Sequence, residues 1–465
     1  MLPPVANSRL PEYHDDLLLV KVRPSAATFA TTAALGGAAG FSILSTLERG
    51  GFIRQVTPLG PQTRPATFSA TAMLAESAAN FSQGSRSLAG VNLIELEKGT
   101  DTKQLRMAMA NDPHIESVSL VPVRYLMARK RTAKPAKPPA TPALSPPSAN
   151  TLWNLAKIKW REAIAGGLGL ASAVRVAVLD TGIDLTHPDL PGAEITYVHE
   201  YPNGPSASDQ DVVGHGTHVS GTIRALIDNQ LGINGITTCK LSVYKIFNDE
   251  TTYIPPPYGD YYAYTVDPIL YRKALAAALD AGIQVVNLSI GGPGAPDQVE
   301  AALFQALIDG GVSVVAAMGN ENSTELSYPA AIPGVIAVGA TTLNDARANF
   351  SNMGPHIALC APGVGIWSTL PTYSGQTGFY RQPDSDPPAM GQPMARDTDY
   401  GNWNGTSMAT PHVAAAAALA LGKNGSTTPA AMKTLLMAAV DRVPGMNGQS
   451  FTSLYGSGRL NLLKL

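Results

Sequence analysis

The stretch VAVLDTGID, residues 176–184, is a short apolar run that ends at Asp180 and continues into a polar turn. Similar runs rich in Val and Ile recur at residues 241–246, 284–290, 312–317 and 335–338, and helical spacing appears at 269–281, 296–309, 407–422 and 429–440. Such runs are typical of parallel strands buried on both faces. Their alternation with helices predicts an α/β domain: a doubly wound, mostly parallel sheet in three layers with right-handed crossovers. Because sites gather where such strands end, Asp180 and Asn320 are candidate site residues.

Two further runs carry side chains that would complement Asp180. They are GHGTHVSGT (214–222), which contains His215, and NGTSMATPHVA (404–414), which contains Ser407. A hydroxyl is a poor nucleophile unless a base removes its proton, and an imidazole does so best when a buried carboxylate orients it. Ser407 also opens an Ala-rich helix, whose unpaired N–H groups suit a developing oxyanion. The three residues therefore form a candidate nucleophile, base and orienting acid.

In their chain order of Asp, His and Ser, and in their flanking residues, these runs resemble the subtilisin-like serine proteases, or subtilases. The resemblance covers residues 153–461. It implies a subtilisin-like fold and peptide hydrolysis by a triad of Asp180, His215 and Ser407 through an acyl-enzyme intermediate. It also implies that Asn320 donates to the oxyanion, and that His187 and His412 flank the motifs without doing chemistry.

The resemblance further assigns substrate binding to the segment 286–292, along which a peptide would lie as an added strand. The assigned residues are Leu288, Ser289, Ile290, Gly291 and Gly292 on one wall of the main specificity pocket, Ala316, Ala317 and Gly319 on the opposite wall, and Ser327 at its floor. Small side chains there leave room for a sizeable apolar residue before the cut bond. Tyr328–Pro329 matches a position where the family has a cis peptide bond, a geometry that proline permits at little cost.

A structural calcium ion is also implied. Asp189 and the loop 227–233 resemble the family's calcium site, in which Asp189, Ile227, Asn229, Leu231 and Ile233 would supply hard oxygen ligands. A turn without any metal is the alternative.

The chain before residue 151 has a different character. Residues 129–150 are rich in Pro, Ala, Lys and Ser, which predicts a linker that contains the processing site. Residues 1–128 show strand patterns at 16–22, 91–96 and 115–123 and helical spacing at 26–49 and 102–112, a small α+β unit of ferredoxin-like type. Its arrangement resembles a subtilase pro-domain, which would act as an intramolecular inhibitor of the peptidase domain, residues 151–465. An adaptor domain is the alternative.

Composition bounds the partners and the compartment. The 465 residues carry a net charge of -2, which predicts neither nucleic acid nor a membrane surface as a partner. Protein or peptide substrates are what the resemblance to subtilases implies. The first residues do not read as a signal peptide, which predicts a cytoplasmic protein, with secretion as the alternative. Cys239 and Cys360 are expected to be buried free thiols.

Two other function classes stay open on the sequence alone. One is a metal-dependent hydrolase that uses His215, His218 and a carboxylate, although no Glu accompanies the His pair as metalloprotease motifs require. The other is a catalytically idle scaffold that only binds peptides. Two long stretches without an evident pattern, 248–266 and 371–399, are expected to rim the cleft.

Overall fold

A computed structural model describes residues 11–23, 47, 50–60, 82–126, 152–199, 209–254, 261–381 and 390–465. The expected linker at 129–150 and nearly all of the expected helix at 26–49 lie outside these ranges.

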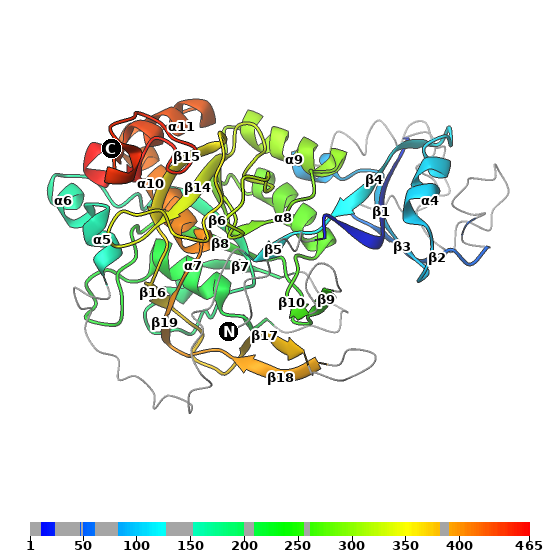
Figure 1. The fold of residues 1–465 in the computed structure, drawn as a ribbon, viewed down its shortest axis with the longest axis horizontal. Coiled ribbons are helices and arrows are strands. Elements are labelled where there is room, and N and C mark those ends of the chain that lie inside the picture. The colour runs from blue at the N-terminus through cyan, green and yellow to red at the C-terminus, as the bar shows by residue number, and fades with distance from the viewer. Residues whose placement is uncertain are drawn as a thin grey trace.

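The larger unit is built on a nine-stranded sheet in the order β20-β21-β15-β14-β13-β11-β6-β8-β7 (Figure 1). Five of its strands were expected from the sequence and are parallel: β6 (Arg175–Asp180), β8 (Lys240–Lys245), β11 (Val285–Leu288), β13 (Ser313–Ala317) and β14 (Ile336–Thr341). The other four complete the edges: β7 (Thr196–Val198), β15 (Ile357–Pro362), β20 (Val440–Asp441) and β21 (Arg459–Leu460). The predicted doubly wound, mostly parallel sheet is thus confirmed.

Helices cover both faces of this sheet. Alternate strand residues point to opposite sides, so Val176 and Val178 join one core cluster while Ala177 and Leu179 join another. The first cluster packs against α7 (His215–Arg224), α10 (Thr406–Asn424) and α11 (Pro429–Ala438), and the second against α8 (Pro268–Asp280) and α9 (Gln298–Asp309). No described helix is long and apolar enough to cross a membrane.

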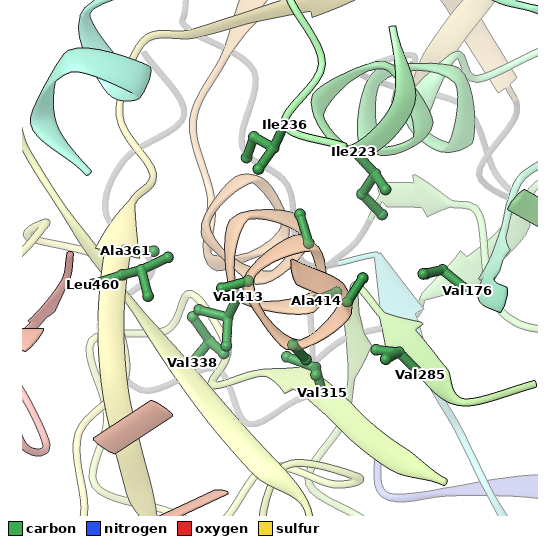
Figure 2. Packing of buried hydrophobic residues seen from close by; sticks show 14 of the residues in the cluster. Val176, Ile223, Ile236, Val285, Val315, Val338, Ala361, Val413, Ala414 and Leu460 are labelled. Carbon is green, nitrogen blue, oxygen red and sulfur yellow. The ribbon is translucent and has the colours of Figure 1, made fainter. Parts of the chain in front are cut away.

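Helix α10 runs through the middle of the first core cluster. All of residues 406–421 are buried. Figure 2 shows Val413 and Ala414 of this helix next to Val338 and Val315 of the sheet, with Ile223 and Ile236 on the other side of the helix. An Ala-rich sequence allows this close approach because it fills little volume. Pro411 lies inside the helix and has no N–H to donate to the carbonyl of Ser407 four residues earlier. That carbonyl instead accepts from Oγ of Ser289 at 3.0 Å, which joins the start of α10 to the segment after β11.

The N-terminal unit is a four-stranded antiparallel sheet in the order β2-β3-β1-β4 with two short helices. Its elements are β1 (Tyr13–Val22), β2 (Ile53–Pro58), α3 (Gln83–Ser87), β3 (Val91–Leu96), α4 (Thr102–Met109) and β4 (Ile115–Pro122). Strands β1, β3 and β4 and helix α4 were expected, but β2 was not. Leu18, Ile94 and Met109 lie in a core of the unit's own.

This unit packs on the larger one through α8 and α9 (Figure 1). Leu19, Leu88 and Leu93 share a core cluster with Tyr271 and Leu303. The carboxylate of Asp280, at the end of α8, also accepts from N of Gly84 at 3.0 Å and from Oγ of Ser82 at 2.6 Å. The start of α3 is therefore held by a side chain of the larger unit.

The two stretches expected as loops form regular structure instead. Strands β9 (Thr252–Ile254) and β10 (Tyr261–Ala263) come from the first, and β17 (Gln376–Arg381) and β18 (Met390–Ala395) from the second. They join in one four-stranded sheet, β18-β17-β10-β9, in which Tyr262 is paired with Phe379. Pairing between segments more than one hundred residues apart leaves no local pattern, so the sequence could not predict it.

Candidate active site

Asp180 and His215 are in contact at the carboxyl edge of the central sheet. Asp180 is the last residue of β6 and His215 the first of α7, and both side chains are fully buried. Nδ1 of His215 lies 2.6 Å from Oδ1 of Asp180, which also accepts from N of Thr181 at 2.8 Å. Because a carboxylate only accepts, Nδ1 carries the proton and Nε2 is the free basic nitrogen. Nε2 is buried and has no hydrogen-bond partner among the described residues.

Ser407 lies in the first turn of α10, where the N-cap Gly405 provides no capping side chain. Its hydroxyl donates to the carbonyl oxygen of Ser289 at 2.9 Å rather than to Nε2 of His215. The base assigned to Ser407 from the sequence is His215, and the structure contains no hydrogen bond between these two side chains. Catalytic hydrogen bonds often form only with substrate bound. In this structure the Ser407 hydroxyl and Nε2 of His215 are therefore not bonded to each other.

Asp211 positions α7 and was missed by the sequence analysis. It is fully buried, and its carboxylate accepts from N of Gly214 and N of Thr217, both at 2.8 Å, and from the hydroxyls of Thr181 and Thr217, both at 2.7 Å. It therefore binds free N–H groups at the start of the helix that carries His215. An acidic residue four positions before His215 was the available signal.

Asn320 lies three residues beyond β13 and contacts the start of α10. Its Oδ1 accepts from N of Thr406 at 2.9 Å and from Oγ1 of Thr406 at 3.0 Å. These two bonds fix the orientation of the amide, so its Nδ2 carries the donors that remain. Asn320 thus contacts the N-terminal turn of α10 at Thr406, the residue before Ser407.

The expected substrate strand is already paired. Ile290–Gly291 forms β12, which pairs antiparallel with β5 (Tyr125–Leu126), the segment that follows the N-terminal sheet. Val266 N donates to Arg124 O at 3.0 Å on the other side of that segment. A Cβ on Gly292 would lie only 2.3 Å from the carbonyl oxygen of Val123, so glycine is needed for this approach. The N-terminal segment therefore lies between β12 and residues 265–266 of the larger unit.

The other residues that were expected to bind substrate lie near β12 and the ends of β11 and β13. Leu288 ends β11, and Ala316 and Ala317 end β13 with no exposure to solvent. Gly319 has φ +102°, and a Cβ there would meet Nδ2 of Asn352 at 2.3 Å. Oγ of Ser327 is buried without a partner among the described residues, and the Tyr328–Pro329 bond is cis, as expected. Ala317 shares a small cluster with Val123, Tyr125, Ile254 and Ala263, so the sheet of inserts borders this site.

The histidines near the motifs are engaged elsewhere. Nε2 of His218 donates to the carbonyl of Ile366 at 3.0 Å while its ring stacks on Trp403, and burial lowers its pKa to about 3. His412 bonds Met408 O and Asn154, with its pKa lowered by burial to about 4, and His187 donates to Asp399 O. Within the described ranges, no group of three or more His, Cys, Asp or Glu could hold a metal. This geometry does not support the metal-dependent hydrolase.

Two of the expected calcium ligands, Asn229 and Ile233, contact Asp189, but they do so through N–H groups and not through oxygen atoms. Oδ1 of this buried carboxylate accepts from Nδ2 of Asn229 at 2.7 Å, and Oδ2 accepts from N of Ile233 at 3.1 Å and from the Tyr400 hydroxyl at 3.2 Å. Oδ1 of Asn229 is itself bound to N of Leu231. Calcium needs oxygen atoms that are free to coordinate it. The donors around Asp189 satisfy the carboxylate without a cation, so this arrangement does not fit calcium.

Both cysteines are buried free thiols, as expected from the sequence. Burial raises the pKa of Cys239 to about 11 and that of Cys360 to about 12. Neither is therefore a reactive thiolate near neutral pH.

Comparison with known proteins identifies the family. A model of the subtilase family matches residues 171–458. Subtilisin BL of Lederbergia lenta is 36% identical over 319 residues, which are 66% of this chain and 96% of that protein. An alkaline protease of Shouchella clausii is 37% identical over 313 residues, 66% of this chain and 68% of that one. The structure of fervidolysin from Fervidobacterium pennivorans, a keratinolytic enzyme related to subtilisin, matches with a TM-score of 0.63 and 25% identity over 98% of this chain and 62% of that chain. The chain therefore belongs to the subtilase family and is a subtilisin-like serine endopeptidase.

Proposed function

We propose that Ser407, His215 and Asp180 hydrolyse peptide bonds through an acyl-enzyme intermediate. The observation that supports this most directly is the 2.6 Å contact between Asp180 and His215, which leaves a basic Nε2 with no hydrogen-bond partner in the described part of the chain. In the reaction the Ser407 hydroxyl turns from the Ser289 carbonyl to Nε2, and its oxygen then attacks the substrate carbonyl. His215 returns the proton to the leaving amine, and water repeats the cycle to release the acid.

The developing oxyanion would be stabilised by two kinds of donor that are already in place. One is the backbone N–H of Ser407 in the first turn of α10, and the other is Nδ2 of Asn320, whose orientation Thr406 fixes. Donors that are already oriented stabilise the charge of the transition state most strongly in a buried site, from which water is excluded. Residues 288–292 would bind the substrate backbone, and the space between them, Ala316, Ala317 and Ser327 would accept the side chain before the cut bond.

A serine-reactive phosphonate tests this assignment. It should label the processed wild-type enzyme on Ser407, and a metal chelator should leave hydrolysis unchanged. Labelling that is absent together with hydrolysis that a chelator abolishes would establish the metal-dependent reaction instead. An idle peptide-binding scaffold would show neither labelling nor hydrolysis.

We also infer that the chain is made as a zymogen and that residues 1–128 inhibit it. Support comes from β5, which pairs with β12 where the backbone of a substrate would pair. Further support comes from the packing of the N-terminal sheet on α8 and α9. The similarity to fervidolysin covers 98% of this chain, so it includes that unit. Fixing the inhibitor in the same chain gives it a high effective concentration.

Intact mass over time measures this processing. Wild-type chain of 48.5 kDa should lose its N-terminal part by a cut between Tyr125 and Asn150, and peptidase activity should rise in step. Ser407→Ala should keep its full mass, because it cannot cut itself. Processing of the alanine variant at the wild-type rate, or full activity before any cut, would mean that the N-terminal unit is an adaptor.

Calcium at Asp189 is tested by thermal unfolding. Because Asp189 already accepts three hydrogen bonds, we expect the same Tm with added calcium and with chelator. A ligand bound only by the folded state raises stability by mass action, at 100 times its Kd by about 2.7 kcal/mol. A rise in Tm with calcium that Asp189→Asn removes would restore the metal site that the sequence suggested.

A further inference from the structure

A buried ion pair joins the N-terminal segment that pairs with β12 to helix α9 of the larger unit. Arg124 immediately precedes β5 and is 2% exposed, and Glu300 of α9 is 0% exposed. Nε and Nη2 of Arg124 donate to the two carboxylate oxygens of Glu300 at 3.1 and 2.8 Å, and Nη1 donates to the carbonyl of Gly294 at 2.8 Å. This is the bidentate geometry that a guanidinium makes and an ammonium cannot.

Glu300 has little else to neutralise it once this segment leaves. The Tyr271 hydroxyl donates to its Oε1 at 3.2 Å, but that group is neutral. The neighbouring Arg272 is already bound to Asp297 and to the carbonyl of Pro268. A buried carboxylate without a cationic partner is costly. After processing, this site is therefore acidic and ready for another cation.

The strand register fixes where this site lies relative to the cut bond. Tyr125 pairs with Gly291 and Leu126 with Ile290. In any peptide bound in this register, the next residue would come opposite Ser289, whose carbonyl accepts the Ser407 hydroxyl. The bond after that residue is then the one within reach of Ser407. Counted back from this bond, the position of Arg124 is the fourth residue.

We propose that the processed enzyme selects peptides with arginine at the fourth residue before the cut bond, and that Glu300 determines this specificity. The proposal rests on the proposed function, since it assumes that Ser407 cuts peptides bound along β12. Lysine, a point charge, should be accepted less well than arginine. Neutral residues would leave the carboxylate unpaired, and glutamate would repel it.

Matched peptides test this on the wild-type enzyme, after the full chain has processed itself. The peptides share the sequence YLMA of residues 125–128 and differ only in the residue that precedes it: Arg, as in the chain itself, or Lys, Gln, Leu or Glu. The kcat/KM for Arg should exceed that for Gln by about 30-fold or more, the effect of losing one partner of a buried charge pair. Mass spectrometry should place the cut after Met in each product. Equal kcat/KM for all five peptides would overturn the proposal.

A variant pair assigns the effect to Glu300. Glu300→Gln should reduce the Arg-to-Gln ratio to within about threefold of one, because the neutral amide gives arginine no charge to pair with. Asp309→Asn makes the same change at an exposed position on the same helix and should keep the wild-type ratio. An unchanged ratio in a folded Glu300→Gln enzyme would refute the role of Glu300.

The two proposals fail in different ways. If Glu300→Gln does not fold, as judged by its melting curve, the wild-type peptide series still decides the preference. Cleavage of all peptides with phosphonate labelling of Ser407 but without an arginine preference would overturn only the specificity. If no peptide is cut and Ser407 is not labelled, the proposed function itself fails.

Discussion

Ser407→Ala is expected to lower turnover by about six orders of magnitude, the loss found when a triad nucleophile is removed. The variant lacks the oxygen that attacks, while Nε2 of His215 and the amide of Asn320 stay in place. Residual hydrolysis should therefore remain about 10³ to 10⁴-fold above the reaction in water. Active-site titration and kcat on a peptide substrate measure the change.

The full-length variant cannot process itself, so it must be compared after its N-terminal unit has been removed by a small amount of wild-type enzyme that is then inactivated with the serine-reactive phosphonate. Ser450→Ala, at an exposed serine near the C-terminus, is the matched control and should behave as wild type. A loss below about tenfold for Ser407→Ala would show that the hydroxyl is not the nucleophile, since such a loss is about 1.4 kcal/mol of barrier.

Asn320→Ala should lower kcat by about two to three orders of magnitude and leave KM nearly unchanged. Its Nδ2 would matter mainly once negative charge develops on the substrate oxygen, so binding of the uncut peptide should survive. Steady-state kinetics on one peptide, with kcat and KM reported separately, measure the split.

Asn320→Asp separates this chemistry from a purely structural role. Aspartate can still accept from N and Oγ1 of Thr406, but it donates nothing and places a negative charge beside the oxyanion. It should be at least as slow as the alanine variant and keep the wild-type Tm. Activity near wild type for Asn320→Asp, or equal losses in kcat and in affinity for both variants, would assign Asn320 to folding or to ground-state binding.

The sequence predicted those strands and site residues that a local residue pattern identifies. Buried parallel strands such as β6 and β11 are short apolar runs, and each was located to within about two residues, the usual uncertainty of element ends. The pairing of Asp180 with His215 followed from motifs, although their contact spans 35 residues. The sequence also led us to expect residues 124–128 to lie along 288–292 as a substrate would, but it did not give the register of β5 against β12.

What the sequence missed depends on distant partners. Asp211 has no motif of its own, and its role appears only when α7 is seen to begin at its carboxylate. Glu300 read as one more charged residue on a helix, because nothing local places it opposite Arg124, 176 residues away. The donors around Asp189 show the reverse case. The residue types matched a metal site, but the direction of each N–H decided against it.

The sheet formed by the two inserts has a consequence for how this enzyme could be shortened or recombined. Strands β9 and β10 have only each other if residues 371–399 are deleted, and a two-stranded hairpin is marginally stable in water. The edge of β10 that now pairs with β17 would then be open to another chain, which invites aggregation. Any chimera made with a compact relative should therefore exchange both inserts together, as one structural module built from two separate stretches of the chain.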